Sequence, residues 1–224
     1  MSRKEAKARK KRKKRYRIKP RFFVVVLLLV AFLGGGAWFF MQEQGKSLYP
    51  TAMNDGRKIM LAAREYINSP LTYEPSSYAG GYPPEGYGVC ADVIWKGFNG
   101  IGVCIKDLVD RDIAENQDAY LDVMPSVDPD LNFRWVPVLE RFFERHAQKL
   151  TTNLDNELAW QPGDIVVFES SHIAIVSELH NIKGRPFIIQ HGHDPAAEED
   201  RIDAEDGMKI SSHFRWYGAL EVDE

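Results

Sequence analysis

A chain of 224 residues allows one domain of ordinary size plus appendages, and an apolar content of 44% is enough for a real hydrophobic core. The net charge of −3 hides a strong asymmetry, because residues 1–21 carry +12 and the remaining residues carry −15. These two regions cannot share one environment or one partner. The basic run is interpreted as a topology signal and a lipid-headgroup contact, and no nucleic-acid partner is expected.

Residues 22–41 form an uninterrupted apolar stretch, FFVVVLLLVAFLGGGAWFFM. Twenty residues in a helix span roughly 30 Å, which matches one hydrocarbon core. A cleaved signal peptide is the alternative, but its apolar region is usually shorter and ends in small residues. Here the far end is aromatic, as in an interfacial anchor. We therefore expect a single-pass membrane anchor with a cytoplasmic N-terminus and an extracellular or periplasmic remainder.

The rest of the chain predicts a tether over 42–55 and an α+β domain over 56–224. Apolar residues recur at helical spacing in four segments, 51–68, 92–99, 107–123 and 136–150. Short apolar runs with a period of two then predict strands at 164–169, 172–178, 186–190 and 213–220. This order predicts N-terminal helices packed on an antiparallel sheet. Residues 70–89 read as a loop, and the acidic residues 198–206 as a solvated loop.

A cysteine follows directly on the Gly- and Pro-rich loop. Cys90 precedes an apolar helical pattern, so it is expected at the first turn of a helix, where the helix dipole lowers the pKa of a thiol. His172 begins a predicted strand after the Gly163-Asp164 turn. A cysteine at a helix start and a histidine on a strand are typical of a papain-like cysteine hydrolase. Cys90 is the expected nucleophile and His172 the expected base.

A third residue should orient the base from the next strand. Gln190 and His191 are both polar and end that strand, but successive residues of a strand point to opposite faces. Only one of them can face the site. His191 is favoured, because Gln190 can instead satisfy a sheet edge.

Two charged residues near the site have more than one interpretation. Asp92 follows the nucleophile by two residues, so it either caps the helix or orients a substrate amine. Arg134 could clamp a carboxylate with two hydrogen bonds, although a bridge to Asp128 or Asp130 in its own loop is favoured.

Metal, cofactor and disulfide chemistry are not expected. Cys90 and Cys104 lie within one helix and the turn after it, which makes a bridge awkward, and Cys104 lies in an apolar run that predicts a buried thiol. His191 and His193 share one face, but a zinc site needs three or four convergent ligands. No phosphate-binding loop or nucleotide fingerprint is present.

Several segments resemble the NlpC-type papain-like cysteine peptidase superfamily. They are Tyr78-x-Gly80-Gly81, the segment around Cys90, Gly163-Asp164, residues 172–175 and residues 189–191. More closely, residues 88–93, residues 128–134 and residues 212–215 resemble a bacterial domain-of-unknown-function family, number 1287, over roughly residues 58–218. This chain has Val-Cys-Ala-Asp where most NlpC-type enzymes have Asp-Cys-Ser-Gly. The resemblance therefore supports the catalytic residues more strongly than it supports the substrate.

The superfamily resemblance implies cleavage of amide bonds in bacterial cell-wall peptides by Cys, His and a third polar residue. It also implies supporting roles for Tyr78, Gly81, His213 and Arg215, and a structural ion pair is favoured for Arg215. We therefore expect a membrane-anchored extracytoplasmic cysteine hydrolase whose partner is a wall peptide or another amide. Two alternatives stay open, namely a catalytically silent binding domain and a thioester-forming acyltransferase. The sequence does not indicate an oligomeric state.

Overall fold

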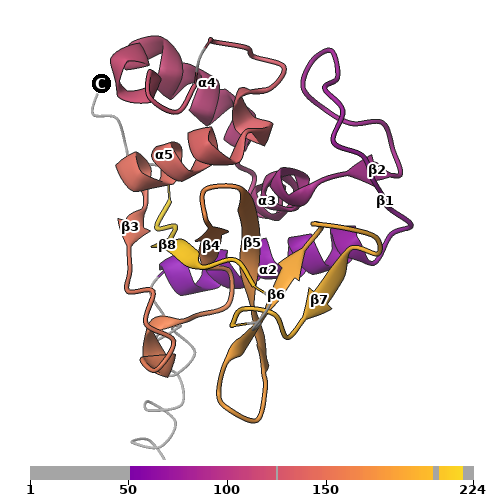
Figure 1. Ribbon diagram of the computed structural model, residues 1–224, viewed down its shortest axis with the longest axis vertical. Helices are drawn as coiled ribbons and strands as arrows, with labels where there is room; N and C mark the ends of the chain where they lie inside the picture. Colours follow the sequence, from indigo (N-terminus) through magenta and orange to yellow (C-terminus); the bar gives the residue numbers. More distant parts are fainter. Residues whose placement is uncertain (1–50, 125, 204–206, 219–224) are drawn as a thin grey trace, which may run out of the picture. The chain divides into compact units, whose positions relative to one another are not determined.

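Helices come first in the chain and the sheet follows, as the α+β prediction requires (Figure 1). The structure is a computed structural model that describes residues 51–124, 126–203 and 207–218, all within Tyr49–Glu224. The predicted basic segment, the predicted anchor at 22–41 and the predicted tether up to residue 50 lie outside the described residues. Within the described ranges, no helix combines the length and apolarity needed to cross a bilayer.

The predicted elements are present with changed ends, and short strands are added. The helices are α2 (Thr51–Ile67), α3 (Cys90–Asn99), α4 (Ile105–Glu115) and α5 (Val136–His146). A small parallel pair is formed by β1 (Thr72–Tyr73) and β2 (Tyr87–Gly88). The main sheet contains β3 (Gln148–Lys149), β4 (Ile165–Phe168), β5 (His172–His180), β6 (Pro186–Gln190), β7 (Ala197–Glu199) and β8 (Ile210–Arg215).

Three helix boundaries differ from the prediction for local reasons. α3 begins at Cys90 instead of residue 92, because the Asp92 carboxylate accepts the Val89 N–H at 2.8 Å and so caps the first turn. α4 ends at Glu115 instead of residue 123, where the Asn116 side chain turns back to the Asp112 carboxylate at 2.9 Å. α5 ends at His146, since the following residues pair as β3 with β8.

The main sheet is antiparallel, in the order β3-β8-β4-β5-β6-β7, and both of its faces are buried. The helix-facing side chains are Ile165, Val167, Ile173, Ile175, Ile189 and Phe214. The opposite face presents Val166, Phe168, Ala174, Val176 and Ile188, which pack with Trp160 and Ile202. Each fully buried aliphatic side chain contributes about 1.5–3 kcal/mol, so the alternating pattern of these strands anchors two apolar clusters on one sheet.

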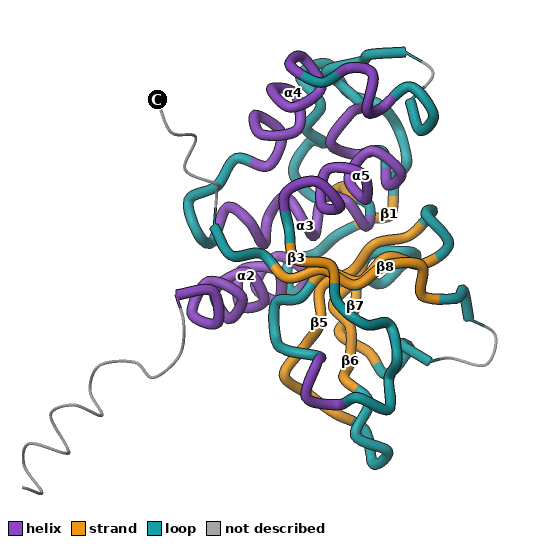
Figure 2. The backbone as a smooth tube through the Cα atoms, turned by 90° about the vertical axis from the view of Figure 1, so that its left-hand side faces the viewer, coloured by secondary structure: helices purple, strands orange, loops and turns teal. Residues whose placement is uncertain are grey.

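Helices α2 and α3 pack on the central strands, which places the start of α3 beside the start of β5 (Figures 1 and 2). Gly97 permits this approach, because a Cβ at that position would lie 2.7 Å from the Ile175 Cδ1 atom. A larger residue would force the Ile175 side chain or α3 itself to shift. The position of Cys90 therefore depends on the helix–sheet contact one to two turns further along.

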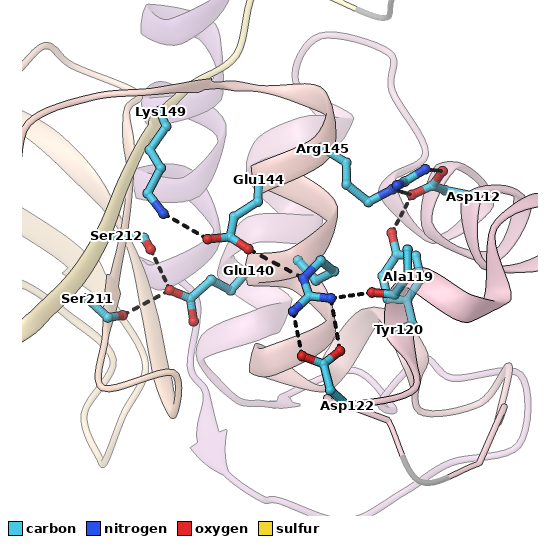
Figure 3. A network of polar contacts seen from close by, with 11 residues as sticks. Asp112, Ala119, Tyr120, Asp122, Glu140, Glu144, Arg145, Lys149, Ser211 and Ser212 are labelled. Atoms are coloured by element: carbon cyan, nitrogen blue, oxygen red, sulfur yellow. Dashed lines mark hydrogen bonds and ion pairs between the residues drawn. The ribbon is translucent and has the colours of Figure 1, made fainter.

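Polar contacts fix α5 on two sides (Figure 3). Glu140 accepts hydrogen bonds from Ser212 at 2.5 Å and from Ser211 at 3.1 Å, both on β8. On the other side, Arg145 donates to the Asp112 carboxylate of α4 at 2.7 Å. Helix α5 is therefore connected by polar contacts to β8 of the sheet and to α4.

Candidate active site

Cys90 and His172 line the same cavity, of about 330 Å³. Cys90 is the first residue of α3 and is 9% exposed, and His172 is the first residue of β5. Aromatic, apolar and polar side chains complete the walls, among them Tyr73, Phe168, Ser171, Ile188, Gln190, His193, Arg201 and Met208. The fold thus brings together two residues that are distant in sequence.

The environment of the sulfur differs from the expectation. Burial raises the pKa of the Cys90 thiol to about 11, although backbone groups of Ile173, Ala91 and Cys90 itself act to lower it. The prediction of a lowered pKa is therefore wrong, because desolvation outweighs the favourable dipole at the helix start. At neutral pH Cys90 carries its proton.

The imidazole of His172 is held by Gln190. The Gln190 side chain lies close enough to the ring to act on its pKa, which it raises. Both side chains lie close to Gly192. A Cβ at that position would be 3.3 Å from the Gln190 Oε1 atom and 3.5 Å from the His172 Nδ1 atom. The Gln190 Nε2 atom donates to Glu199, which turns Oε1 toward the ring.

This arrangement sets the proton positions of the imidazole. We assign the proton of the neutral ring to the Nδ1 atom of His172, because the Gln190 Oε1 atom on that side can only accept a hydrogen bond. The Nε2 atom has no hydrogen-bond partner among the described residues. Burial lowers the pKa of His172, and the Gln190 hydrogen bond opposes this shift only in part. No hydrogen bond joins Nε2 to the Cys90 sulfur, so proton transfer between the two groups requires that their side chains approach each other.

His191 has other neighbours than expected. Its Nε2 atom lies 3.4 Å from the Asp194 Oδ1 atom, and its ring meets Tyr73 edge-on at a centroid distance of 5.6 Å. A Cβ at Gly88 would be 3.5 Å from its Nδ1 atom, on the side of Tyr66 and Asp92. The structure therefore places the Gln190 side chain beside the His172 ring, whereas the contacts of His191 are with Asp194 and Tyr73.

Asp92 and Arg134 form a buried ion pair. The guanidinium donates to the carboxylate at 3.1 and 2.9 Å, and a further bond runs to the Ser76 carbonyl at 2.7 Å. Burial raises the pKa of Asp92, and Arg134 opposes that shift. The expected bridge from Arg134 to its own loop is wrong, because Asp130 instead accepts the Gly80 N–H at 2.9 Å.

Tyr73 forms a wall between two cavities. A second cavity, of about 280 Å³, shares Tyr73, Cys90 and Ser171 with the first, and its other lining residues come from the chain after β1, the loop before α5 and the start of α5, among them Pro75, Trp135 and Pro137. The Asp194 carboxylate fixes this wall by accepting the Tyr73 N–H at 2.7 Å. Cys90 thus lies where two cavities meet.

Tyr78 and Gly81 belong to the supporting loop. The Tyr78 ring lies 5.3 Å from the Arg134 guanidinium, and its carbonyl accepts the Gly81 N–H at 2.8 Å. Gly81 has a φ of +81°, and a Cβ there would come within 2.7 Å of the Phe133 ring. Both residues shape the chain around Arg134, and neither lines the two cavities.

His213 and Arg215 serve the sheet. The His213 Nε2 atom and the Arg215 guanidinium both contact Asp164, at 2.9 and 2.7 Å. The His213 ring stacks on Trp160 at 3.8 Å. The expected acidic partner of Arg215 is therefore Asp164, and both residues lie away from the cavity linings.

Both cysteines are free thiols. Cys104 is only partly buried, and its Sγ atom lies 3.6 Å from the Tyr82 Oη atom. Across the described residues, no three His, Cys, Asp or Glu side chains converge as metal ligands would.

Sequence reasoning missed three residues of the cavity walls. Tyr73 lay in a loop without any periodic pattern, and only the β1–β2 pairing, with Tyr73 opposite Gly88, brings it to Cys90. Ser171 was assigned to a turn, and Arg201 to a solvated acidic loop. The sequence did hold a weak signal for Ser171, because this residue directly precedes His172, the first residue of β5.

Comparisons with known proteins give a family but no solved fold. The family described as Domain of unknown function (DUF1287) matches residues 60–216. The protein YijF of Escherichia coli (strain K12), whose name describes it as uncharacterized, is 32% identical over 174 residues, which cover 73% of this chain and 83% of that protein. No solved structure matches the chain.

Proposed function

We propose that this chain, which belongs to the DUF1287 family, is a cysteine hydrolase of amide bonds with Cys90 as nucleophile, His172 as general base and Gln190 as the residue that orients the base. The observation that carries the proposal is that the sulfur and the imidazole line one cavity while an amide oxygen holds the far side of the ring. Gln190 replaces His191 in the role expected from the sequence.

The protonation states support proton transfer during attack. The Nε2 atom of neutral His172 takes the Cys90 proton as the sulfur adds to the substrate carbonyl. The C–N bond then breaks, His172 returns the proton to the leaving amine, and a thioester remains on Cys90. Water adds to the thioester with His172 as base again, and the carboxylic acid leaves as the thiol re-forms.

Backbone donors at the sulfur suit the developing oxyanion. The amides of Cys90 and Ala91 begin α3, and Ile173 contributes a further backbone group from β5. Rigid N–H groups at a helix start stabilise negative charge without reorganisation. They support acyl chemistry at this sulfur.

The proposed substrate is a peptide amide of the bacterial cell wall. The support is the resemblance of the Cys90 and His172 segments to the NlpC-type superfamily, which also suggests a papain-like fold. The apolar stretch at 22–41 supports a membrane anchor with the hydrolase domain outside the cytoplasm.

A digest of purified wall fragments tests the proposal. Wild type should release new amine-bearing products detectable by mass spectrometry, and Cys90→Ala should lower their rate by more than about 10³-fold. Cys104→Ala is the matched control, since it removes the other thiol, and should retain activity. Products that carry an added amine or alcohol in place of water would instead establish an acyltransferase.

A catalytically silent binding domain is the second candidate. The high pKa of the Cys90 thiol favours it, because an unactivated sulfur suits a role in binding. Binding of wall fragments by wild type and Cys90→Ala alike, without any product, would decide for this candidate and against hydrolysis.

A further inference from the structure

The hairpin formed by β5 and β6 presents apolar side chains to solvent. Among the large apolar side chains of the described ranges, Ile182 at its tip and Leu158 of the preceding loop are the two most exposed, at 105% and 89%. Leu179, near the end of β5, is exposed as well. Single apolar residues are common on protein surfaces, but several at one projecting end indicate a surface that contacts an apolar partner.

These side chains come from two segments that lie against each other. The Glu157 carboxylate lies beside Gly184 of the hairpin, because a Cβ at Gly184 would collide with it. Leu158 follows Glu157 directly. We call residues 157–159 and 179–184 the hairpin end. Figure 1 shows the hairpin extending from the sheet at the opposite end of the domain from α4.

The chain enters the domain on the side of the hairpin end. Helix α2 begins at Thr51. A Cβ at Gly56 would lie 2.7 Å from the carbonyl oxygen of Pro162, shortly after the 157–159 segment. Arg57 pairs with Glu178, the residue before the 179–184 segment, at 3.8 Å. The first turns of α2 are therefore close to both segments.

The length of the connecting chain limits how far a bilayer can be from this side. This step rests on the membrane anchor at 22–41, which is part of the proposed function. Nine residues, 42–50, connect that stretch to α2, and they span at most about 30 Å when fully extended. A bilayer that holds the anchor must therefore pass within this distance of the start of α2.

We propose that the hairpin end docks on the lipid bilayer, with Ile182 and Leu158 at the boundary between headgroups and acyl chains. Apolar side chains at a projecting tip leave water when they enter this boundary. Lys183, which is exposed beside Ile182, can keep its ammonium group among the lipid phosphates.

Docking at this end holds the proposed catalytic residues away from the lipid. Strand β5 runs from His172, which lines the cavity, to His180 next to the hairpin tip. The rise between these two residues is about 26 Å at roughly 3.3 Å per residue. Gln190 correspondingly ends β6 at the cavity. The distance suits a substrate in the wall rather than a lipid.

A fluorescent probe at position 182 tests the docking. In the full chain with Cys90→Ala and Cys104→Ala, Ile182→Cys provides one thiol for the dye NBD. The protein is reconstituted into phosphatidylcholine–phosphatidylglycerol vesicles, with and without lipids that carry a nitroxide quencher on the upper acyl chain. The proposal predicts a blue-shifted emission and a loss of about half of it on nitroxide lipids, because the probe lies within about 5–10 Å of the boundary. The same dye on Leu158→Cys should respond alike.

Leu121→Cys is the matched control for the dye itself. Leu121 is also exposed, but it follows Tyr120, whose hydroxyl donates to Asp112 on α4, away from the hairpin. The dye at this position should keep the emission of a probe in water and should not be quenched by the nitroxide lipids. Circular dichroism of each labelled variant establishes that it is folded.

The remaining outcomes separate the docking surface from the anchor. Equal quenching at positions 182 and 121, in protein that floats with the vesicles in alkaline carbonate, overturns the docking surface and leaves the anchor in place. Release of the full chain from the vesicles by alkaline carbonate overturns the anchor, and the docking with it. Hydrolysis is tested separately by the digest of wall fragments.

Discussion

At the scale of single residues, the pair Gln190 and Glu199 determines which nitrogen of His172 is free. Glu199 accepts the amide hydrogen of Gln190, so the amide oxygen is committed to the ring. His191 makes its contacts on the other side of β6, with Asp194 and Tyr73. In the proposed mechanism, this pair acts through the orientation of His172.

Gln190→Ala should lower kcat/KM about 10–100-fold, because the ring loses the acceptor that fixes its tautomer. The measurement is the pH profile of product release, whose acid limb should move as the Gln190 hydrogen bond no longer affects the pKa of His172. His191→Gln is the comparison and should leave the acid limb in place. The reverse result, a shift with His191→Gln alone, would restore His191 as the orienting residue.

The raised pKa of Cys90 predicts a distinctive reactivity. The alkylation rate of Cys90 by iodoacetamide should climb about tenfold per pH unit from neutral pH and level off only near pH 11. Activity should behave differently, because it needs neutral His172 and a protonated thiol. It should rise as the pH passes the lowered pKa of His172 and then stay level. An alkylation rate already constant at pH 5 would instead reveal a preformed thiolate–imidazolium pair.

The sequence predicted Cys90 and His172 as a pair because each lies at the start of an element with a clear pattern, and the structure brings both to one cavity. It could not choose between Gln190 and His191. The alternation of side chains along a strand shows that the two point to opposite faces, but it does not show which of them faces His172. The choice depends on the register of β5 with β6, which pairs Ile175 with Ile189. A bulge in that hairpin shifts the register, and no local pattern encodes it.

At the scale of elements, α5 has polar contacts both with the sheet and with α4. Asp112 on α4 receives hydrogen bonds from Arg145 of α5 and from Tyr120 (Figure 3). The His146 Nε2 atom lies 3.0 Å from the same carboxylate. Burial alone would raise the pKa of Asp112, but these partners together hold it at about 2. The ordinary value is 3.8, so the ionised form is stabilised by folding.

The resulting acid sensitivity can be tested directly. Because the folded pKa of Asp112 is depressed, its contribution to stability is present above about pH 4 and is lost as the pH falls toward 2. Asp112→Asn should lower the free energy of unfolding at neutral pH and flatten its fall between pH 4 and 2. Urea unfolding across that range measures both effects, with Asp118→Asn as an exposed control. Parallel curves for wild type and Asp112→Asn would refute the assignment.

The apolar pattern of the sequence predicted the helices and strands well, but it did not predict which side chains pair between them. The apolar spacing of residues 136–146 reports which face of α5 is buried, whereas the pairing of Arg134 with Asp92 joins residues on separate elements. A sequence offers several acids for one arginine. Only the packing of α3 against the loop before α5 decides among them.

At the scale of the molecule, one sheet carries both apolar clusters. Neighbouring residues of β5, such as Ile175 and Val176, belong to opposite faces and therefore to different clusters. The two proposed catalytic residues come from different layers. Cys90 begins a helix that packs on the sheet, and His172 begins a strand of the sheet. Neither cluster can loosen without disturbing the other face of the same strand.

Ile175→Ala and Val176→Ala should therefore both lower a single unfolding transition. We expect the Ile175 change to cost about 2–5 kcal/mol and the Val176 change somewhat less, because fewer methyl groups are lost. Calorimetry together with tryptophan fluorescence should give coincident transitions for both variants. Two separated transitions, each sensitive to one variant, would show that the clusters unfold independently.

Because the sulfur of Cys90 is protonated, this residue should resist oxidation. Hydrogen peroxide attacks thiolates, so a buried thiol with a pKa of about 11 forms sulfenic acid slowly. Such a sulfur stays reduced in surroundings where an activated cysteine would be lost. In the proposed hydrolase, the burial that protects this sulfur from oxidants would also keep it unreactive until a substrate carbonyl is bound beside it.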